Sequence, residues 1–111
     1  MQIQVTRPAG AAVMTVKGRM DAVTAQDFDR AFDALIQEKA VRIVLHFGGL
    51  EYISSAGLRS VLAAGKKAKS AQGSLVLCGL NGMVREVFEI SGFATMLPLF
   101  DTEEAALKSL A

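Results

Sequence analysis

Residues 41–58 read VRIVLHFGGLEYISSAGL, and they lie at the centre of the pattern that decides the fold. The run 41–47 is apolar and rich in branched side chains, which is typical of a strand covered on both faces of its sheet. Apolar residues then recur at helical spacing over 58–68, and Gly73 ends that helix. A second apolar run follows at 74–78. A strand, a helix and a strand in this order predict a right-handed, parallel crossover.

The N-terminal part adds a hairpin and a helix to this crossover. Residues 2–7 and 12–17 each alternate between apolar and polar side chains, and a Pro and a Gly separate them, so we predict two hairpin strands. Over 24–39 the apolar period becomes helical. Thr24, followed three residues later by Asp27, resembles a capping box that would satisfy the first free N–H groups of this helix.

The C-terminal part adds two helices and a short strand. A helix is predicted over 82–91, a short edge strand that tolerates Pro98 over 96–100, and a last helix from about Thr102. No linker, internal repeat or low-complexity segment divides residues 1–111. We therefore predict one α/β domain, with a mixed sheet of parallel central strands packed against about four helices.

The charge balance bears on the kind of partner. Twelve basic and eleven acidic side chains give a formal net charge of +1, which is too small for a nucleic-acid-binding surface. We expect protein partners, no direct nucleic-acid binding, no cofactor and no metal. The one basic cluster, Lys66, Lys67 and Lys69, falls in the last turns of a predicted helix, where cations oppose the helix dipole. We interpret it as a solvated helix end.

The single cysteine, Cys78, excludes an internal disulfide and lies in an apolar run, as expected of a reduced intracellular protein. We predict that Cys78 is a core residue whose thiol pKa is raised by its apolar surroundings. Residues 1–7 alternate, unlike a signal peptide, and no stretch approaches the roughly 18 apolar residues of a membrane span. We therefore expect a cytoplasmic protein without membrane insertion.

The segment 47–58 is predicted to be a loop that follows the central strand and leads into a helix. Partners of an open α/β sheet meet the carboxyl ends of its strands, so this loop is the first place to look for function. Ser54 and Ser55 stand just before Gly57. One hydroxyl could cap the helix, or one could accept a phosphate, because a helix start offers free N–H groups and a favourable dipole. Position alone does not choose between these interpretations.

Residues 52–59, YISSAGLR, closely resemble the signature loop of STAS domains, the fold of anti-sigma factor antagonists, in which a serine is phosphorylated. The resemblance runs from about Gln2 to Leu110 and implies a single STAS domain. Segments in the family's order carry the rest of the likeness: residues 18–21, 41–47, 77–80 and 88–93.

Carried over position by position, the resemblance implies that Ser55 is the phosphate acceptor. Ala56 stands where the family has a serine or threonine, and Gly57 matches the family's glycine. Ser54 replaces the usual aspartate, which would help to position a kinase, and Ser54 remains a minor alternative site of phosphorylation. We expect Gly57 to allow close approach of a partner, and Gly57→Val to keep the fold while obstructing the kinase.

Other residues around the loop are predicted partner contacts. Asp21 matches a family aspartate near the phosphorylation loop, where it either orients the kinase or serves only at a turn or helix start. Glu51 and Tyr52 flank the loop, although Tyr52 could equally pack beneath it. His46, at a strand end where the family more often has an acidic residue, is interpreted as a strand residue. The predicted partner-binding residues are Asp21, Glu51, Tyr52, Ser54, Ala56, Gly57 and Arg59.

The resemblance implies a partner-switching mechanism. The dephosphorylated protein would bind an anti-sigma factor with serine kinase activity and so free the sigma factor. Phosphorylation would reverse the binding, and a serine phosphatase would reset the cycle. The alternative is a STAS accessory subunit of a lipid-transport ATPase or a stressosome-like scaffold, and self-association stays open.

An enzyme is not expected. A hydrolase built on Ser55 and His46 would need a nucleophile elbow, and the sequence lacks the glycine two residues before the serine that such an elbow requires. In the implied mechanism the kinase and phosphatase chemistry belongs to the partners, and this chain is their substrate.

Overall fold

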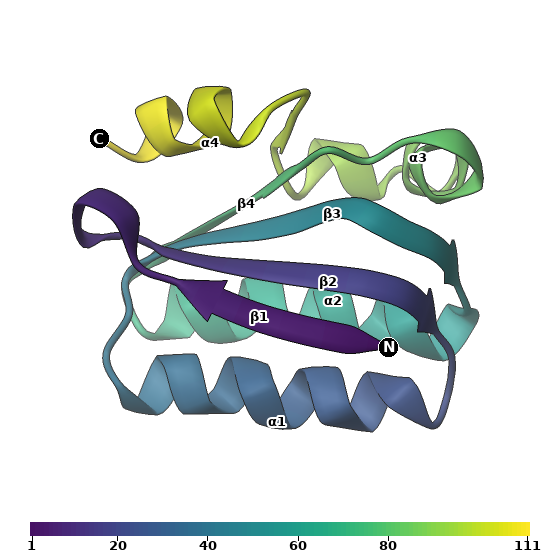
Figure 1. The fold of residues 1–111 in the computed structure, drawn as a ribbon, viewed down its shortest axis with the longest axis horizontal. Helices are drawn as coiled ribbons and strands as arrows, with labels where there is room; N and C mark the ends of the chain where they lie inside the picture. The colour runs from purple at the N-terminus through teal and green to yellow at the C-terminus, as the bar shows by residue number, and fades with distance from the viewer.

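The computed structural model describes all residues from Met1 to Ala111 as a five-stranded sheet with four α-helices (Figure 1). The strands lie side by side in chain order. Their bounds are β1 Gln2–Thr6, β2 Ala12–Met20, β3 Arg42–Ile53, β4 Ser74–Cys78 and β5 Leu99–Phe100. The helices are α1 Thr24–Gln37, α2 Ser55–Ser70, α3 Gly82–Ile90 and α4 Glu103–Leu110, with short 3-10 turns η1 Pro8–Gly10 and η2 Phe93–Thr95.

The sheet has one antiparallel pair and three parallel pairs. β1 and β2 form the predicted antiparallel hairpin, whereas β2, β3, β4 and β5 pair in parallel. The predicted parallel crossover is confirmed as β3, α2 and β4. Figure 1 shows α1 and α2 on one face of the sheet and α4 on the other. The α/β architecture with a mixed sheet and four helices is therefore confirmed.

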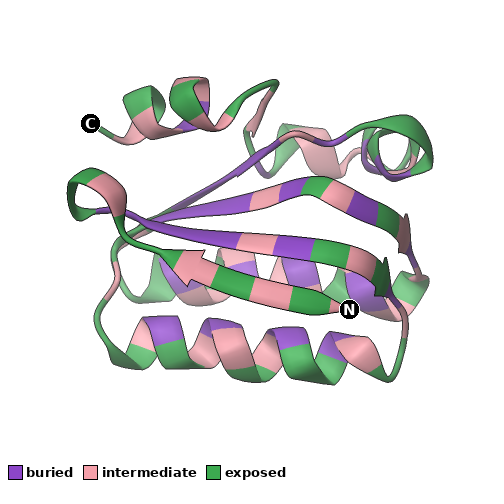
Figure 2. Ribbon diagram, in the orientation of Figure 1, coloured by how far each residue is buried: buried purple, intermediate pink, exposed green.

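The main core fills the space between the sheet and helices α1, α2 and α3 and comprises 22 buried residues. Phe28 and Phe32 of α1 stack with their ring centroids 6.0 Å apart, and Phe47 of β3 lies 6.5 Å from Phe88 of α3. Figure 2 shows buried residues on the sides of α1 and α2 that face the sheet. Fully burying one such side chain contributes about 1.5–3 kcal/mol, so this face dominates the stability of the fold.

Cys78 lies in a smaller cluster beneath α4, together with Val13, Val44, Val76 and Ala106. Its side chain is fully buried, and this burial, with a smaller effect from Glu103, raises the pKa of the thiol to about 11. The thiol is therefore protonated and unreactive at neutral pH. The prediction of a core cysteine is confirmed.

The central strands are longer than predicted, and the loop predicted over 47–58 is wrong. β2 continues to Met20 and β3 to Ile53, and these two residues are paired. The ladder passes two register shifts, after Thr15 and after Gly18, which hide the alternation from a sequence-based prediction. Gly49 lets β3 pass close to β2, because an added Cβ would lie 2.7 Å from Cγ of Lys17. Glycines that appear to break the strand therefore keep it paired.

α1 ends near Lys39, as predicted: its last residue is Gln37, Lys39 adopts a left-handed φ of 62°, and the N–H of Ala40 donates to the carbonyl of Leu35. One element end differs from prediction. β5 covers only Leu99–Phe100 rather than residues 96–100. The other predicted helices and strands match within a few residues. None of the helices combines the length and the apolar character that crossing a membrane requires.

Candidate functional site

The starts of α1 and α2 lie next to each other at the carboxyl ends of β2 and β3 (Figure 1, right-hand end of the sheet). The parallel ladder continues to Met20 and Ile53, so both strands end at the same level. The N–H of Ser54 then donates to the carbonyl of Met20 over 2.8 Å. Both helices begin here, and the carboxyl edge of a parallel sheet is where partners bind in open α/β folds.

Asp21 caps the start of α1. Its Oδ1 accepts the backbone N–H groups of Val23 at 3.0 Å and of Thr24 at 2.9 Å, and the hydroxyl of Thr24 lies 3.1 Å away. In return the Thr24 hydroxyl accepts the N–H of Asp21 at 2.8 Å. These bonds, led by those from Thr24, hold the pKa of Asp21 below its ordinary value. The reciprocal box therefore joins Asp21 and Thr24.

The capping box predicted for Thr24 and Asp27 is wrong, because the Thr24 hydroxyl is directed back to Asp21 instead. Asp27 pairs with Arg30 on the exposed surface of α1. Of the two interpretations of Asp21, the structure shows the helix-start role. A contact with a partner stays a prediction for this residue.

The two serines at the start of α2 have different environments. Ser54 is half-buried, and its Oγ accepts the N–H of Gly57 at 3.1 Å as the N-cap. Ser55 is exposed and is the first helical residue, and its hydroxyl makes no hydrogen bond. The first turn of α2 contains no acidic side chain. Ser55 therefore presents a free hydroxyl beside unneutralised N–H groups, whereas Ser54 is engaged in the fold.

Gly57 has a structural role that the sequence interpretation missed. It is buried, and a Cβ at this position would lie 2.8 Å from Cγ1 of Ile53 and 3.1 Å from both Cγ and the carbonyl oxygen of Met20. The absent side chain lets α2 start directly against the ends of β2 and β3. The expectation that the fold would accept Gly57→Val is wrong, because the obstructing atoms belong to the core and the backbone.

Tyr52 and Arg19 lie side by side on the face of the sheet opposite to α1 and α2, because the residues that follow them, Ile53 and Met20, belong to the core beneath those helices. They are paired across β3 and β2, and the guanidinium of Arg19 lies 4.2 Å from the centroid of the Tyr52 ring. Tyr52 is half-buried in this stack, so it is neither fully beneath the site nor fully at its rim. Such a cation–π contact contributes about 0.5–1 kcal/mol at exposed sites. It fixes the direction of both side chains.

The remaining predicted contacts differ in exposure. Glu51 and Arg59 are exposed, and Ala56 is half-buried on α2. Sequence reasoning missed Val23, whose side chain is 75% exposed at the start of α1. The signal was available, because Val23, directly before α1, is out of phase with the buried Phe28 and Phe32 of that helix.

His46 lies in β3, as predicted, and its Nδ1 accepts the N–H of Gly48 at 3.1 Å. It stands seven residues before Ile53 on the same strand, which corresponds to roughly 23 Å at 3.3 Å per residue. His46 therefore does not reach Ser55, and the two residues form no catalytic pair.

A family model described as STAS domain matches residues 2–106, almost the whole chain. The chain belongs to the STAS domain family. Sequence relatives agree with this membership. BtrV of Bordetella bronchiseptica, whose name describes it as a candidate anti-sigma factor antagonist, is 40% identical over 96% of this chain and 91% of its own. The anti-sigma F factor antagonist of Paenibacillus polymyxa is 27% identical over 99% of this chain and 95% of its own.

Solved structures of STAS proteins share the fold. An anti-sigma factor antagonist from Mycobacterium paratuberculosis superposes with a TM-score of 0.90 at 24% identity, covering 98% of this chain and 92% of its own. At that identity the likeness is evidence for the STAS fold and for nothing finer. The resemblance inferred from the sequence is confirmed at the level of family and fold, whereas the individual site residues stay predictions.

Proposed function

We propose that this STAS domain is an anti-sigma factor antagonist whose binding is switched by phosphorylation of Ser55. The observation that carries the proposal is the contrast between its two serines: Ser55 offers an exposed, unbonded hydroxyl at the first position of α2, and the Ser54 hydroxyl is occupied as the cap. The names of the sequence relatives support the proposed class of partner.

In the proposed cycle, the dephosphorylated chain binds an anti-sigma factor that is itself a serine kinase, and the sigma factor is released. The contact surface comprises the adjoining starts of α1 and α2, with Val23 as an apolar contact and Asp21, Glu51, Ser54, Ala56 and Arg59 around Ser55. Tyr52 borders this surface through its stack with Arg19. A serine phosphatase resets the cycle, which takes place in the cytoplasm.

A phosphate on Ser55 changes the surface without requiring a change of fold. It adds about −1.5 to −2 charges at neutral pH, which a helix start accommodates because its N–H groups and dipole favour an anion. The same charge at a packed interface adds repulsion and a desolvation cost. A loss of about 3 kcal/mol weakens a complex roughly a hundredfold, which is enough for a switch.

The first test identifies the acceptor serine. The parent, Ser55→Ala and Ser54→Ala are incubated with the cognate kinase and ATP, and peptide masses are mapped. We expect one phosphate on Ser55 in the parent and in Ser54→Ala, and none in Ser55→Ala. Ser70→Ala, at the far end of α2, is the matched control and should be labelled like the parent. Full labelling of Ser55→Ala, with the phosphate on Ser54, would overturn the assignment.

The second test measures binding to the anti-sigma factor by calorimetry. The enzymatically phosphorylated protein should bind about a hundredfold more weakly than the dephosphorylated protein, with a similar melting temperature. Val23→Asp should weaken binding as well, because it places a charge at the proposed apolar contact. Val41→Asp is the control, since Val41 is also an exposed valine (46%) but lies at the other end of β3. Equal affinity of the phosphorylated and dephosphorylated forms would contradict the proposal.

The alternative is a STAS accessory subunit of a lipid-transport ATPase or a stressosome-like scaffold. It predicts that different proteins co-purify with the chain. Purification of the chain with its bound proteins, with and without ATP, separates the two. The proposed function predicts an anti-sigma factor kinase whose retention depends on the nucleotide. Recovery of transporter subunits or of a large assembly of STAS proteins would favour the alternative.

A further inference from the structure

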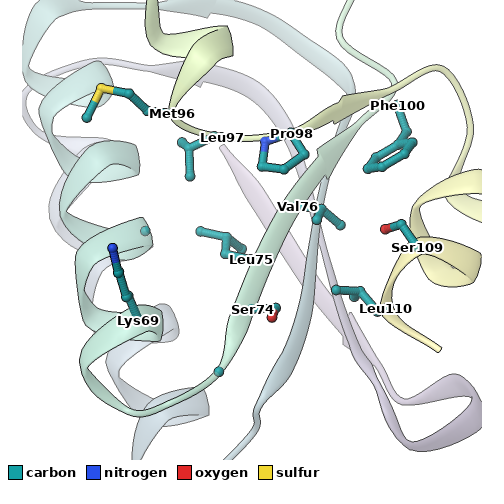
Figure 3. A pocket seen from close by; sticks show the side chains of 12 residues that line it. Lys69, Ser74, Leu75, Val76, Met96, Leu97, Pro98, Phe100, Ser109 and Leu110 are labelled. Atoms are coloured by element: carbon teal, nitrogen blue, oxygen red, sulfur yellow. The ribbon is translucent and has the colours of Figure 1, made fainter.

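A groove of about 370 Å³ runs along β4 at the end of α2 opposite to Ser55. Leu75 and Val76 of β4 form its floor, Leu97 and Lys69 stand on the α2 side, and Leu110 stands on the α4 side (Figure 3). A second hollow of about 400 Å³ shares the Lys69 and Leu97 lining and extends the groove over α2. Ser55 and Lys69 are fourteen residues apart on α2, roughly 21 Å along the helix axis.

The edge of β4 that faces this groove lacks a neighbouring strand along half of its length. β5 pairs only with Leu77 and Cys78. Leu77 donates its N–H to the carbonyl of Pro98 on the β5 side, whereas Ser74 donates to Val41 on the β3 side. Since backbone groups alternate between the two sides of a strand, the N–H and C=O of Leu75 point to the β5 side, into the groove.

Pro98 explains why β5 does not continue over Leu75. The next position in the parallel ladder would require residue 98 to donate its N–H to the carbonyl of Leu75, and proline has no N–H. The residues before Pro98 do not continue the strand beside β4, because they form the η2 turn, which is capped at Met96. One donor and one acceptor of a central strand are therefore left facing a groove, and unpaired backbone groups of this kind are what a β-strand partner binds.

The charged side chains that line the groove and the hollow beside it are all basic. Lys67 pairs with Asp33 of α1 over 2.7 Å, but Lys66 and Lys69 take part in none of the six ion pairs of the structure. Both line the hollow over α2, beside Met96, whose side chain is 60% exposed. A partner segment that combines an apolar side chain with a carboxylate would therefore match this part of the surface.

We infer that the β4 groove binds a short, extended, acidic peptide segment of a partner protein, which adds a strand beside Leu75 and places a carboxylate near Lys66 and Lys69. The open edge from Ser74 to Val76 measures roughly 10 Å, so it accommodates about three to four residues of such a strand. This site is separate from the proposed switch surface around Ser55 and does not depend on it.

The walls of the groove favour a single strand over a second copy of this sheet. Lys69 and Leu97 flank the β4 edge on one side, and Ser109 and Leu110 flank it on the other, as Figure 3 shows. A second copy would bring its own flanking helices against α2 and α4, whereas an isolated peptide strand has none. The groove therefore selects a peptide by shape as well as by its backbone groups.

The test uses the pentapeptide acetyl-EVTVE-amide and NMR of the ¹⁵N-labelled full chain. We expect the amide of Leu75 to shift and to become protected from hydrogen exchange, while the amide of Leu77, which already donates to Pro98, stays unchanged. The peptide with a methylated central amide nitrogen and the charge-reversed acetyl-KVTVK-amide are controls for backbone pairing and for charge. Both should bind more weakly.

Lys69→Glu should weaken binding of the acidic peptide about fivefold, as expected for reversing one exposed charge pair. Lys17→Glu, on the exposed surface of β2, is the matched control. If the charge reversal in Lys69→Glu disturbs the fold, Lys69→Gln is measured in its place. No change at Leu75 at millimolar peptide overturns the proposal, as do shifts confined to the Ser55 region. Protection of Leu75 that rises with protein concentration in the absence of peptide would instead assign the edge to self-association.

Discussion

The starts of α1 and α2 are neighbours at one end of the sheet but differ in their chemistry. In α1 the carboxylate of Asp21 accepts two backbone N–H groups and contacts the Thr24 hydroxyl, so a permanent negative charge occupies the helix start. In α2 the neutral hydroxyl of Ser54 accepts one N–H, and no acidic side chain lies in the first turn. One start already holds an anion, and the other is equipped to receive one.

The difference also shows at the third residue after each cap. Thr24 uses its side chain to complete the box with Asp21, whereas Gly57 has no side chain because Met20 and Ile53 occupy the space. The first helix start is therefore stabilised by polar bonds and the second by close packing. Substitutions at Gly57, Asp21 and Ser54 separate these two contributions.

Gly57→Val should have the largest effect. The added side chain meets the carbonyl of Met20 and the side chain of Ile53, so α2 must move away from the sheet. Overpacking of this kind costs about 2–3 kcal/mol of unfolding free energy. Urea unfolding measures it, with Ser70→Val at the exposed end of α2 as the control for helix propensity. A change below about 0.5 kcal/mol, as for an ordinary surface substitution, would show that the close contact at Gly57 is unimportant.

Asp21→Ala should be the next in size, because it removes a cap with several hydrogen bonds and leaves the first N–H groups of α1 without an acceptor. Asp21→Asn is the matched variant, since asparagine caps helices as well as aspartate does. Thermal unfolding of the two should show a clear loss for alanine and a small one for asparagine. Equal losses in both would mean that the charge of Asp21, and not its bonds, stabilises α1.

Ser54→Ala should cost about 0.5–1 kcal/mol, because a single hydroxyl cap is lost and Gly57 N–H remains solvated at a helix end. Ser54→Asp should do the opposite and stabilise the start of α2 by about 0.3–1 kcal/mol, through the same dipole effect that favours a phosphate. Chemical unfolding at low salt measures both, and high salt should reduce the gain from aspartate. A destabilised Ser54→Asp would show that the start of α2 does not favour anions.

The smallest effect is a pH dependence at Asp21. The folded state lowers the pKa of this carboxyl below the ordinary value of 3.8, so its stabilising effect is complete above that value and is lost as the pH falls through the folded pKa. The melting temperature of the parent should therefore converge on that of Asp21→Asn only below about pH 4. Convergence already at pH 6 would contradict a lowered pKa.

Long-range order was predictable from the sequence, and local chemistry was less so. The crossover from Arg42 to Cys78 and the core position of Cys78 follow from short apolar runs that are rich in branched side chains. The end of β3 was missed because register shifts in β2 and the pair Gly48 and Gly49 hide its alternation. Bulges depend on the partner strand, which a linear pattern does not contain.

The roles of the site residues were also only partly predictable from the sequence. Ser54 and Ser55 could be placed at a helix start from the sequence, but only the bond to the Gly57 N–H shows which one is engaged. The true box of Asp21 and Thr24 has the same three-residue spacing as the predicted one, so spacing alone could not separate them. Gly57 was misjudged because its obstacle, Met20, comes from a strand 37 residues earlier in the chain.

The stack of Tyr52 on Arg19 provides an optical probe of the proposed switch surface. The chain contains a single tyrosine and no tryptophan, so its ultraviolet emission comes from that one ring when it is excited at wavelengths that phenylalanine does not absorb. The ring lies three residues before Ser55 and 4.2 Å from a guanidinium that a bound partner or a nearby phosphate would attract. Emission intensity and its quenching by iodide therefore report on this end of the molecule alone, in the unlabelled protein and in real time.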